Sequence, residues 1–157
     1  MLLPALLLCT GCRKAAPPAK EDGQAVVEGK GIVWAYHDLT SALAEAKTAN
    51  KPIMMDVFAT WCGPCKLLDQ NVFSRPEVGE ASKAFVTVKI DGDQNDALKR
   101  QYRVTGYPTV LFLAPDGKEI GRSYGAVSYD IMLEVMAKAQ QEFAGGASSN
   151  PPTPAPK

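Results

Sequence analysis

The chain has 157 residues, of which 46% are hydrophobic and 22% are charged, and this size and composition predict a single globular domain. Its 17 basic residues balance 17 acidic residues, so it lacks the positive field that nucleic-acid-binding proteins use. No apolar run reaches the roughly 18 residues that a membrane-spanning helix needs. These values argue against a nucleic-acid partner and exclude a transmembrane channel or carrier.

The two ends of the chain differ in composition from its middle. Residues 1–11 are apolar and rich in leucine, and Cys12 follows them. A polar, Pro/Ala-rich stretch comes next, and the last residues are rich in glycine, serine and proline. The Pro/Ala-rich stretch and the last residues have too little apolar surface to offset the entropy of ordering them. We therefore expect a linker at 12–30, a folded domain at 31–144 and a disordered tail at 145–157.

The apolar start of the chain resembles the end of a bacterial lipoprotein signal peptide. In this interpretation Cys12 becomes the lipidated N-terminus, and Cys9 leaves with the signal peptide. No lysine or arginine precedes the apolar stretch, as it would in a secretory signal, and a start codon upstream of Met1 would account for this. The alternative is a hydrophobic N-terminus on a cytosolic protein, although an exposed leucine run gives such a protein no advantage. We therefore expect export and a membrane anchor, with Cys62 and Cys65 as the cysteines of the folded domain.

The middle of the chain alternates between β-prone runs and segments with apolar residues at helical spacing. Asp38 or Thr40 is suited to cap the first helix, Asp93 or Asn95 a later one, and Ser128 the last. We expect strands at 32–36, 53–58, 85–91, 109–113 and 119–124, with helices between 38 and 50, from 62 to about 72, at 76–84, at 93–102 and from 128 to about 143.

This order, β-α-β-α-β-α-β-β-α, predicts an α/β fold with a central mixed sheet and helices on both faces. Alternating units imply parallel strands joined by helical crossovers, and a tight turn at 115–118 makes the last two strands an antiparallel hairpin. The run 53–58 has the length and apolar content of a buried central strand, interrupted by one acid, Asp56. Because a charge inside an apolar strand is costly, Asp56 is a candidate for function.

The segment Trp61-Cys62-Gly63-Pro64-Cys65 lies where this strand leads into a helix. There the unpaired N–H groups of the first helical turn and the helix dipole favour a thiolate at Cys62. Cys62 is therefore expected to be an exposed, activated nucleophile. Cys65 lies one turn further along, facing the interior, and is expected to close a small disulfide ring with Cys62 and to displace a bound substrate thiol.

The motif Trp61-Cys62-Gly63-Pro64-Cys65-Lys66 and the order of elements strongly resemble the thioredoxin family over roughly residues 32–143. Within this family, the pattern Phe73-Ser74-x-Pro76-x-Val78 is similar to that of the C-terminal periplasmic domain of the thiol:disulfide interchange protein DsbD. The resemblance implies a thioredoxin fold and thiol–disulfide oxidoreductase activity without a cofactor. The Gly-Pro spacer between the cysteines accompanies reducing potentials in the family, so the resemblance favours a reductase over an oxidase or isomerase.

The resemblance also assigns roles to two acids. Asp56 matches the buried acid of thioredoxins, which exchanges a proton with the second cysteine, and the alternative is an acid at a strand end with a local hydrogen bond. Asp69 matches an acid that DsbD-like domains use near the thiols as support for proton transfer. The alternative for Asp69 is a solvated helix surface.

Substrate-binding residues follow from the same resemblance. Tyr107-Pro108 matches the cis-proline loop of the family, which lies opposite the disulfide and presents backbone groups to an extended substrate. Trp61, Gly63 and Pro64 surround the thiols, and Trp61 would shield one side of the disulfide.

No metal site or covalent haem is expected in the folded domain. The chain has a single histidine, His37, and a zinc site needs about four ligands. Lys66 stands where a c-type haem motif requires histidine.

The expected partners are proteins that carry disulfides or thiols, and a membrane-embedded electron donor of the DsbD type. The expected location is the periplasm or another extracytoplasmic membrane face, and family likeness favours a monomer. A lipid-anchored binding or chaperone module with a structural disulfide is the alternative from another class. The sequence leaves the physiological substrate and the identity of the membrane open.

Overall fold

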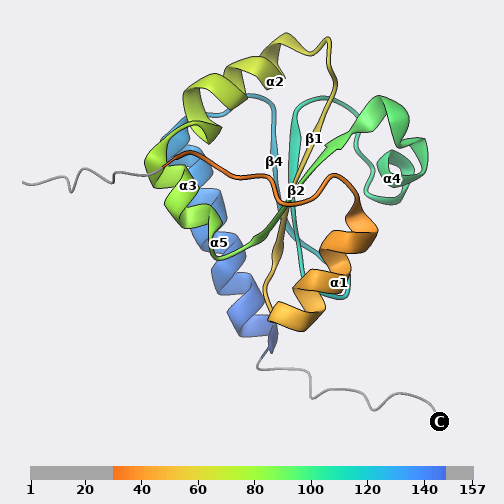
Figure 1. Ribbon diagram of the computed structural model, residues 1–157, viewed down its shortest axis with the longest axis vertical. Coiled ribbons are helices and arrows are strands. Elements are labelled where there is room, and N and C mark those ends of the chain that lie inside the picture. The colour runs from red at the N-terminus through yellow and green to blue at the C-terminus, as the bar shows by residue number, and fades with distance from the viewer. Residues whose placement is uncertain (1–29, 148–157) are drawn as a thin grey trace, which may run out of the picture.

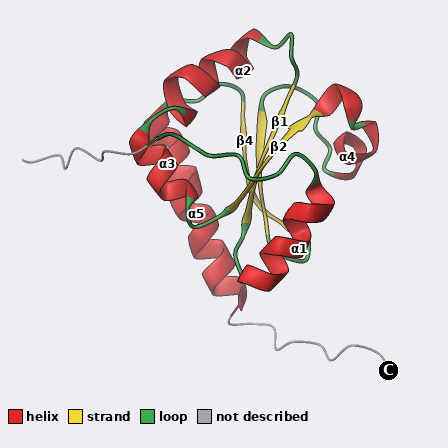
Figure 2. Ribbon diagram, viewed as in Figure 1, coloured by secondary structure: helices red, strands yellow, loops and turns green. Residues whose placement is uncertain are grey.

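The computed structural model describes residues 30–147, which form one central sheet covered by helices on both faces (Figure 1). The predicted α/β class with helices on both faces is therefore confirmed (Figure 2). The strands are β1 (Ile53–Phe58), β2 (Val86–Asp91), β3 (Thr109–Leu113) and β4 (Glu119–Tyr124), and the helices are α1 (Leu39–Ala49), α2 (Gly63–Leu68), α3 (Pro76–Ser82), α4 (Asp96–Gln101) and α5 (Tyr129–Ala147). A π-helical turn, η1 (Asp69–Phe73), extends α2, and a 3₁₀ turn, η2 (Gly92–Gln94), follows β2.

The strand order is β2-β1-β3-β4, with β1 parallel to β2 and antiparallel to β3. The final hairpin of β3 and β4 is antiparallel, as predicted. The prediction that helical crossovers keep the earlier strands parallel is wrong for β3. Since α4 has six residues, it is about 9 Å long, roughly half the length of a strand, and does not carry the chain back across the sheet. Strand β3 therefore starts at the end of the sheet where β2 stops.

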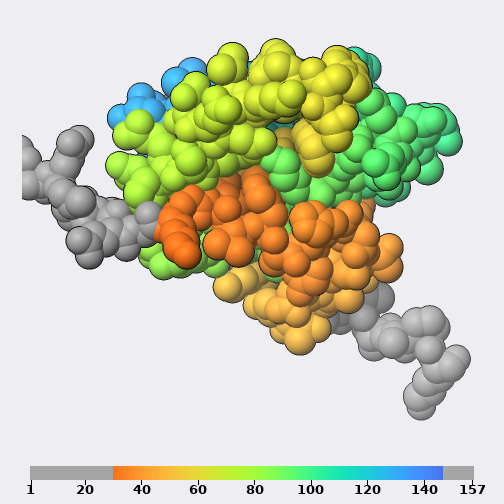
Figure 3. All heavy atoms as spheres, turned by 45° about the horizontal axis from the view of Figure 1, so that its top comes forward, coloured from red at the N-terminus to blue at the C-terminus, as the bar shows by residue number. Residues whose placement is uncertain are grey.

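The predicted strand at 32–36 is also wrong, because this segment makes only one isolated bridge, between Tyr36 and Val88. The N–H groups of Ala35 and Tyr36 both donate to the Thr87 carbonyl, at 3.2 and 3.1 Å. Further upstream the chain leaves the sheet edge, and the Ile32 N–H donates to the Phe73 carbonyl at 2.7 Å. We call residues 30–36 the N-terminal strap. Figure 3 shows the orange atoms of this part of the chain lying against the yellow-green atoms that follow α2.

Two apolar clusters hold the helices on the sheet. One contains α1 and residues around α4, and the other contains residues of α2, η1, α3 and α5. Successive residues of β1 alternate between the clusters, since Met55 and Val57 belong to the first and Met54 to the second. Asp56 shares the face of Met54 and so lies on the side of the sheet that α2 covers. The prediction of a buried central strand at 53–58 is confirmed.

The helix ends follow local chemistry. Asp38 caps α1, because its Oδ1 accepts a hydrogen bond from the Ser41 N–H at 2.7 Å. The last helix was expected to end near Phe143, but α5 continues to Ala147. Once a helix exists, each added residue gains one backbone hydrogen bond without a new nucleation cost, so the glycines near its end do not stop it at once.

The predicted signal peptide at 1–11, the anchor at Cys12 and most of the linker and tail lie outside the described residues. Within residues 30–147, no helix combines the length and the apolar character needed to cross a membrane.

Candidate active site

Cys62 and Cys65 form a disulfide at the start of α2, with an S–S distance of 2.08 Å. Cys62 is the N-cap residue of the helix, and its Sγ accepts a hydrogen bond from the Cys65 N–H at 3.1 Å. This is the placement that the sequence predicts, with one sulfur at the helix N-terminus and the other one turn inside. The sulfur nearest the helix N-terminus is the one that backbone N–H groups stabilise as a thiolate after reduction.

The expectation of an exposed Cys62 is wrong, since the residue is only 2% exposed and Cys65 only 4%. Both belong to a small apolar cluster with Ala59, and Phe58 and Tyr107 pack against it. Exposure around the disulfide comes from its neighbours Trp61, Gly63 and Pro64 instead. A partner must therefore approach Cys62 across these residues.

The loop opposite the disulfide contains a cis peptide bond between Tyr107 and Pro108, as predicted. Pro108 is buried, and its carbonyl accepts a hydrogen bond from the Gly125 N–H at 2.9 Å. The carbonyl of Gly106 accepts one from the Thr109 hydroxyl at 2.8 Å. These bonds fix the loop from both sides of Tyr107, whose ring contacts the cysteine cluster.

Asp93 joins the two aromatic residues of the site, a role that the sequence analysis missed. Its Oδ2 accepts a hydrogen bond from Trp61 Nε1 at 2.6 Å, and its Oδ1 accepts one from the Tyr107 hydroxyl at 2.9 Å. The two rings meet edge to face with centroids 5.9 Å apart. A Cβ at Gly92 would lie 2.5 Å from the Tyr107 side chain, so the glycine makes room for this ring. One feature of the sequence could have indicated this role. Asp93 directly follows β2, and the carboxyl end of β2 lies beside that of the parallel strand β1, which leads to the cysteines.

Asp56 is buried, with 1% of its surface exposed, and faces Lys89 of β2. The two residues are register partners in the parallel pair of strands, and Lys89 Nζ lies 3.2 Å from Asp56 Oδ2. Among the described residues, Asp56 Oδ1 has no hydrogen-bond partner. Burial raises the pKa of Asp56 to about 6, while the ammonium group of Lys89 opposes this rise and the charge of Asp69 adds to it. The carboxyl group is therefore poised to exchange a proton near neutral pH.

Asp69 occupies the first position of η1 and also contacts Lys89 Nζ. Its side chain is 41% exposed, so one side of the Lys89 ammonium group faces a half-exposed carboxylate and the other a buried one. The structure thus joins Asp69 to Asp56 through a shared cation. Lys89 is the second residue of the site that the sequence analysis missed, and its place within an apolar run gave only a weak signal.

Three aromatic rings lie around the ammonium group of Lys89. Its Nζ lies 5.2 Å from the ring centroid of Trp34, 5.0 Å from that of Phe58 and 5.7 Å from that of Phe73. Trp34 and Phe73 also meet edge to face at 5.2 Å. Trp34 belongs to the N-terminal strap, so a segment far from the cysteines in sequence forms one wall of the Asp56–Lys89–Asp69 network.

Comparisons with known proteins agree on this architecture. A family model described as thioredoxin-like matches residues 34–115. The thioredoxin of Mycoplasmoides gallisepticum is 33% identical over 94 residues, which make up 60% of this chain and 90% of that protein. The chain belongs to the thioredoxin-like family. The solution structure of a thioredoxin from Thermus thermophilus matches this thioredoxin-like protein with a TM-score of 0.63 at 28% identity, covering 74% of this chain and 93% of that chain.

A further relative is the thiol:disulfide interchange protein DsbD of Klebsiella pneumoniae, which is 38% identical over 86 residues. The match covers 52% of this chain but only 14% of that protein, so the thioredoxin-like chain spans a small part of its DsbD relative. Its family membership and the Cys62–Cys65 disulfide make this protein a thioredoxin-like thiol–disulfide oxidoreductase.

Proposed function

We propose that this thioredoxin-like protein is a membrane-tethered, extracytoplasmic reductase of protein disulfides. The observation that carries the proposal is the position of Cys62, whose Sγ accepts the Cys65 N–H at the start of α2 beside the Tyr107–Pro108 loop. After reduction the same N–H stabilises a thiolate at Cys62, which is the attacking form.

The reaction has two exchange steps. The Cys62 thiolate attacks one sulfur of a substrate disulfide, forms a mixed disulfide and releases the other substrate sulfur as a thiolate. Cys65 then loses its proton and attacks Cys62 Sγ, which releases the second substrate thiolate. The substrate gains two electrons and, at neutral pH, two protons, and the Cys62–Cys65 disulfide is left behind. We assign to Asp56 the role of acceptor of the Cys65 proton in this second step, with the Lys89 ammonium group stabilising its carboxylate and the charge of Asp69 opposing that effect.

Substrate binding is assigned to the exposed rim around the disulfide. Trp61, Gly63 and Pro64 are exposed there, and a Cβ added to Gly63 would meet nothing within 4 Å. A substrate backbone therefore approaches this edge without obstruction. Because the Pro108 carbonyl is already engaged by Gly125, we assign the pairing with substrate backbone to Tyr107 and the packing beneath it to Pro108.

The direction of electron flow is tested by a redox titration. The protein is equilibrated with defined dithiothreitol or glutathione ratios, and free thiols are counted by mass after alkylation. A reduction potential near about −270 mV supports the reductase, whereas one near about −120 mV indicates an oxidase. If the disulfide stays oxidised at every ratio tested, both catalytic interpretations fail and the binding or chaperone module is the interpretation that remains.

The membrane anchor is a separate part of the proposal. It rests on the apolar segment 1–11 ahead of Cys12, and it includes a periplasmic monomer that receives electrons from a membrane-embedded donor of the DsbD type. The name of the DsbD relative, a thiol:disulfide interchange protein, supports thiol–disulfide exchange with a partner protein. Replacing Cys12 with serine should move the protein from the membrane to the soluble fraction of its host and abolish incorporation of labelled fatty acid. Unchanged fractionation of Cys12→Ser contradicts the lipid anchor without affecting the redox proposal.

A further inference from the structure

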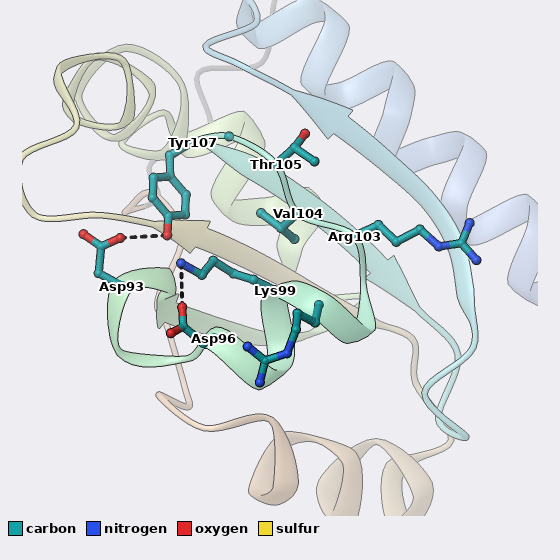
Figure 4. Close-up of a pocket in the computed structure, with 9 residues that line it drawn as sticks. Asp93, Asp96, Lys99, Arg103, Val104, Thr105 and Tyr107 are labelled. Atoms are coloured by element: carbon teal, nitrogen blue, oxygen red, sulfur yellow. Dashed lines mark hydrogen bonds and ion pairs between the residues drawn. The ribbon is translucent and has the colours of Figure 1, made fainter.

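A pocket of about 480 Å³ opens beside the cis-proline loop (Figure 4). Residues of η2, of α4 and of the loop before β3 line it. Tyr107 forms part of its wall and also packs against the Cys62–Cys65 cluster, so one side chain separates the pocket from the disulfide. A polypeptide whose disulfide reaches Cys62 therefore lies within one side chain of this pocket.

The acidic side chains of the pocket already have partners within the protein. Both oxygens of Asp93 accept hydrogen bonds from Trp61 and Tyr107, and Asp96 pairs with Lys99 at 2.9 Å. Both carboxylates that line the pocket are thus engaged by the protein itself.

Two arginines of the pocket, Arg100 and Arg103, make no ion pair within residues 30–147, although Lys99 lowers the pKa of Asp96 and the charge of Arg100 adds to this effect. Both are exposed. Figure 4 shows the Arg103 side chain extending away from the pair of Lys99 and Asp96 and also away from Tyr107, so Arg103 lies on the side of the pocket farther from the disulfide. Arginine presents a planar fork of donors that matches a carboxylate, so two such groups in one pocket favour an acidic ligand.

The backbone at Arg103 gives a second reason to assign it a function. Arg103 follows the end of α4 with φ of +52°, in the left-handed region. Glycine or asparagine usually takes this position after a helix, because a side chain there costs about 1 kcal/mol. Arginine at this position incurs that backbone cost, which supports a role for its side chain at the pocket.

We propose that this pocket, which we call the arginine pocket, binds an acidic segment of the disulfide-containing polypeptide that Cys62 attacks. The inference rests on the proposed function and adds a substrate class to it. Val104 and the Tyr107 ring supply apolar contact at the pocket wall, while Arg100 and Arg103 bind Asp or Glu side chains in the segment that flanks the substrate cystine. The positive charge of the arginines then selects the substrate, and Cys62 and Cys65 reduce the disulfide of the bound polypeptide.

The test compares two cystine-containing peptides that differ only in their flanks, Asp and Glu in one and Asn and Gln in the other. The reduced full chain is mixed with each peptide, and the second-order rate constant of disulfide reduction is measured at low and high salt. We expect the acidic peptide to react about tenfold faster at low salt and the difference to shrink at high salt.

The variant Arg100→Ala/Arg103→Gly should lose this preference while it reduces the neutral peptide at the unchanged rate. Glycine suits the left-handed backbone at 103, so the variant is expected to fold. A matched control, Lys47→Ala/Lys138→Ala, removes the same charge from exposed positions on α1 and α5 and should keep the preference. Equal rates for the two peptides in the unaltered protein, or an equal preference in the arginine variant, would overturn the proposal.

A binding measurement separates this proposal from the redox function. The acidic peptide with serine in place of its cysteines is titrated into the oxidised protein and into the arginine variant by calorimetry. Binding to the former alone supports the arginine pocket even if neither peptide is reduced, which would count against the proposed function only. Equal binding to both, or binding to neither, overturns the arginine pocket whatever the outcome of the redox assays.

Discussion

Lys89 is the register partner of Asp56, and its ammonium group lies between the buried carboxylate of Asp56 and the half-exposed carboxylate of Asp69. One cation therefore holds two acids that differ in their access to water. The pairing uses Oδ2 of Asp56 and leaves Oδ1 without a partner among the described residues. That oxygen is the one we expect to take the proton of Cys65, because Lys89 already engages the other.

The pKa of Asp56 makes stability depend on pH. Its value of about 6 in the folded protein lies above the usual value of 3.8, so the folded state binds this proton more tightly than the unfolded state. The contribution to stability is fully present below about pH 4 and is lost as the pH rises through 6. The loss amounts to about 3 kcal/mol from this group.

Asp56→Asn removes this dependence. At pH 8 we expect its free energy of unfolding to exceed that of the unaltered oxidised protein by about 1–3 kcal/mol, because asparagine carries no charge to bury. At pH 4 the two proteins should differ little. Urea unfolding at both pH values measures this, and an equal difference at pH 4 and pH 8 would show that Asp56 is not the titrating group.

Substitution of the cysteines should separate the two chemical steps. Cys62→Ser removes the attacking sulfur and should abolish reduction of protein disulfides, whereas Cys65→Ser should leave a stable mixed disulfide between Cys62 and the substrate. Non-reducing electrophoresis and mass spectrometry of the adduct distinguish them. If the Cys62→Ser variant instead forms a stable mixed disulfide between Cys65 and the substrate, Cys65 is the attacking cysteine and the assigned roles are reversed.

Asp93 should affect protein substrates more than small ones. Asp93→Ala removes the hydrogen bonds to Trp61 and Tyr107, which releases both aromatic side chains at the rim of the site. Because Asp93 and Trp61 are exposed and Tyr107 is half-buried, we expect only about a threefold to tenfold loss in the rate of protein-disulfide reduction, a change in Trp61 fluorescence and an unchanged rate with a small disulfide. Asp130→Asn, at an exposed acid in the first turn of α5, is the matched control. An equal loss with both substrates would place Asp93 in the chemical step.

Trp34 should tune the pKa of Asp56 from the N-terminal strap. The charged groups that face Asp56 are Lys89 from β2 and Asp69 from η1, and the Trp34 ring covers Lys89 at 5.2 Å. Trp34→Ala admits water to this network, so we expect the pKa of Asp56 to fall by about half a unit to one unit, since burial is the main cause of its rise.

The titration of Asp56 followed by NMR of its carboxyl carbon measures this change. Trp34→Phe keeps an aromatic ring over the ammonium group and should restore most of the shift. If Trp34→Ala leaves the pKa of Asp56 unchanged, the strap has a packing role alone.

Features that depend on neighbouring residues in the chain were predictable from sequence. The position of Cys62 and Cys65 at a helix start follows from a strand that runs into Gly63-Pro64, and the buried central strand follows from its continuous apolar residues. The cis bond before Pro108 followed from the family motif. In each case the deciding interactions lie within one element or one short motif.

Features that depend on distant segments were not predictable. The segment 32–36 has the composition of a strand, but its Ile32 N–H bonds to Phe73 instead of a strand neighbour. The direction of β3 depends on the end of the sheet at which the chain lies after the short helix α4. Lys89 and Asp93 reach Asp56 and Trp61 across about 30 residues of chain, which periodicity does not encode.

The sequence by itself determined the chemistry of this protein, because a Cys-x-x-Cys pair at a helix start and an acid inside an apolar strand are local arrangements with few other uses. The tertiary structure decided the surroundings of that chemistry. It buried both sulfurs beside Tyr107, placed Lys89 between Asp56 and Asp69, and opened the arginine pocket next to the disulfide. These outcomes arise from packing between strands and loops distant in the chain, where small differences in burial set both the pKa of Asp56 and the access of a substrate.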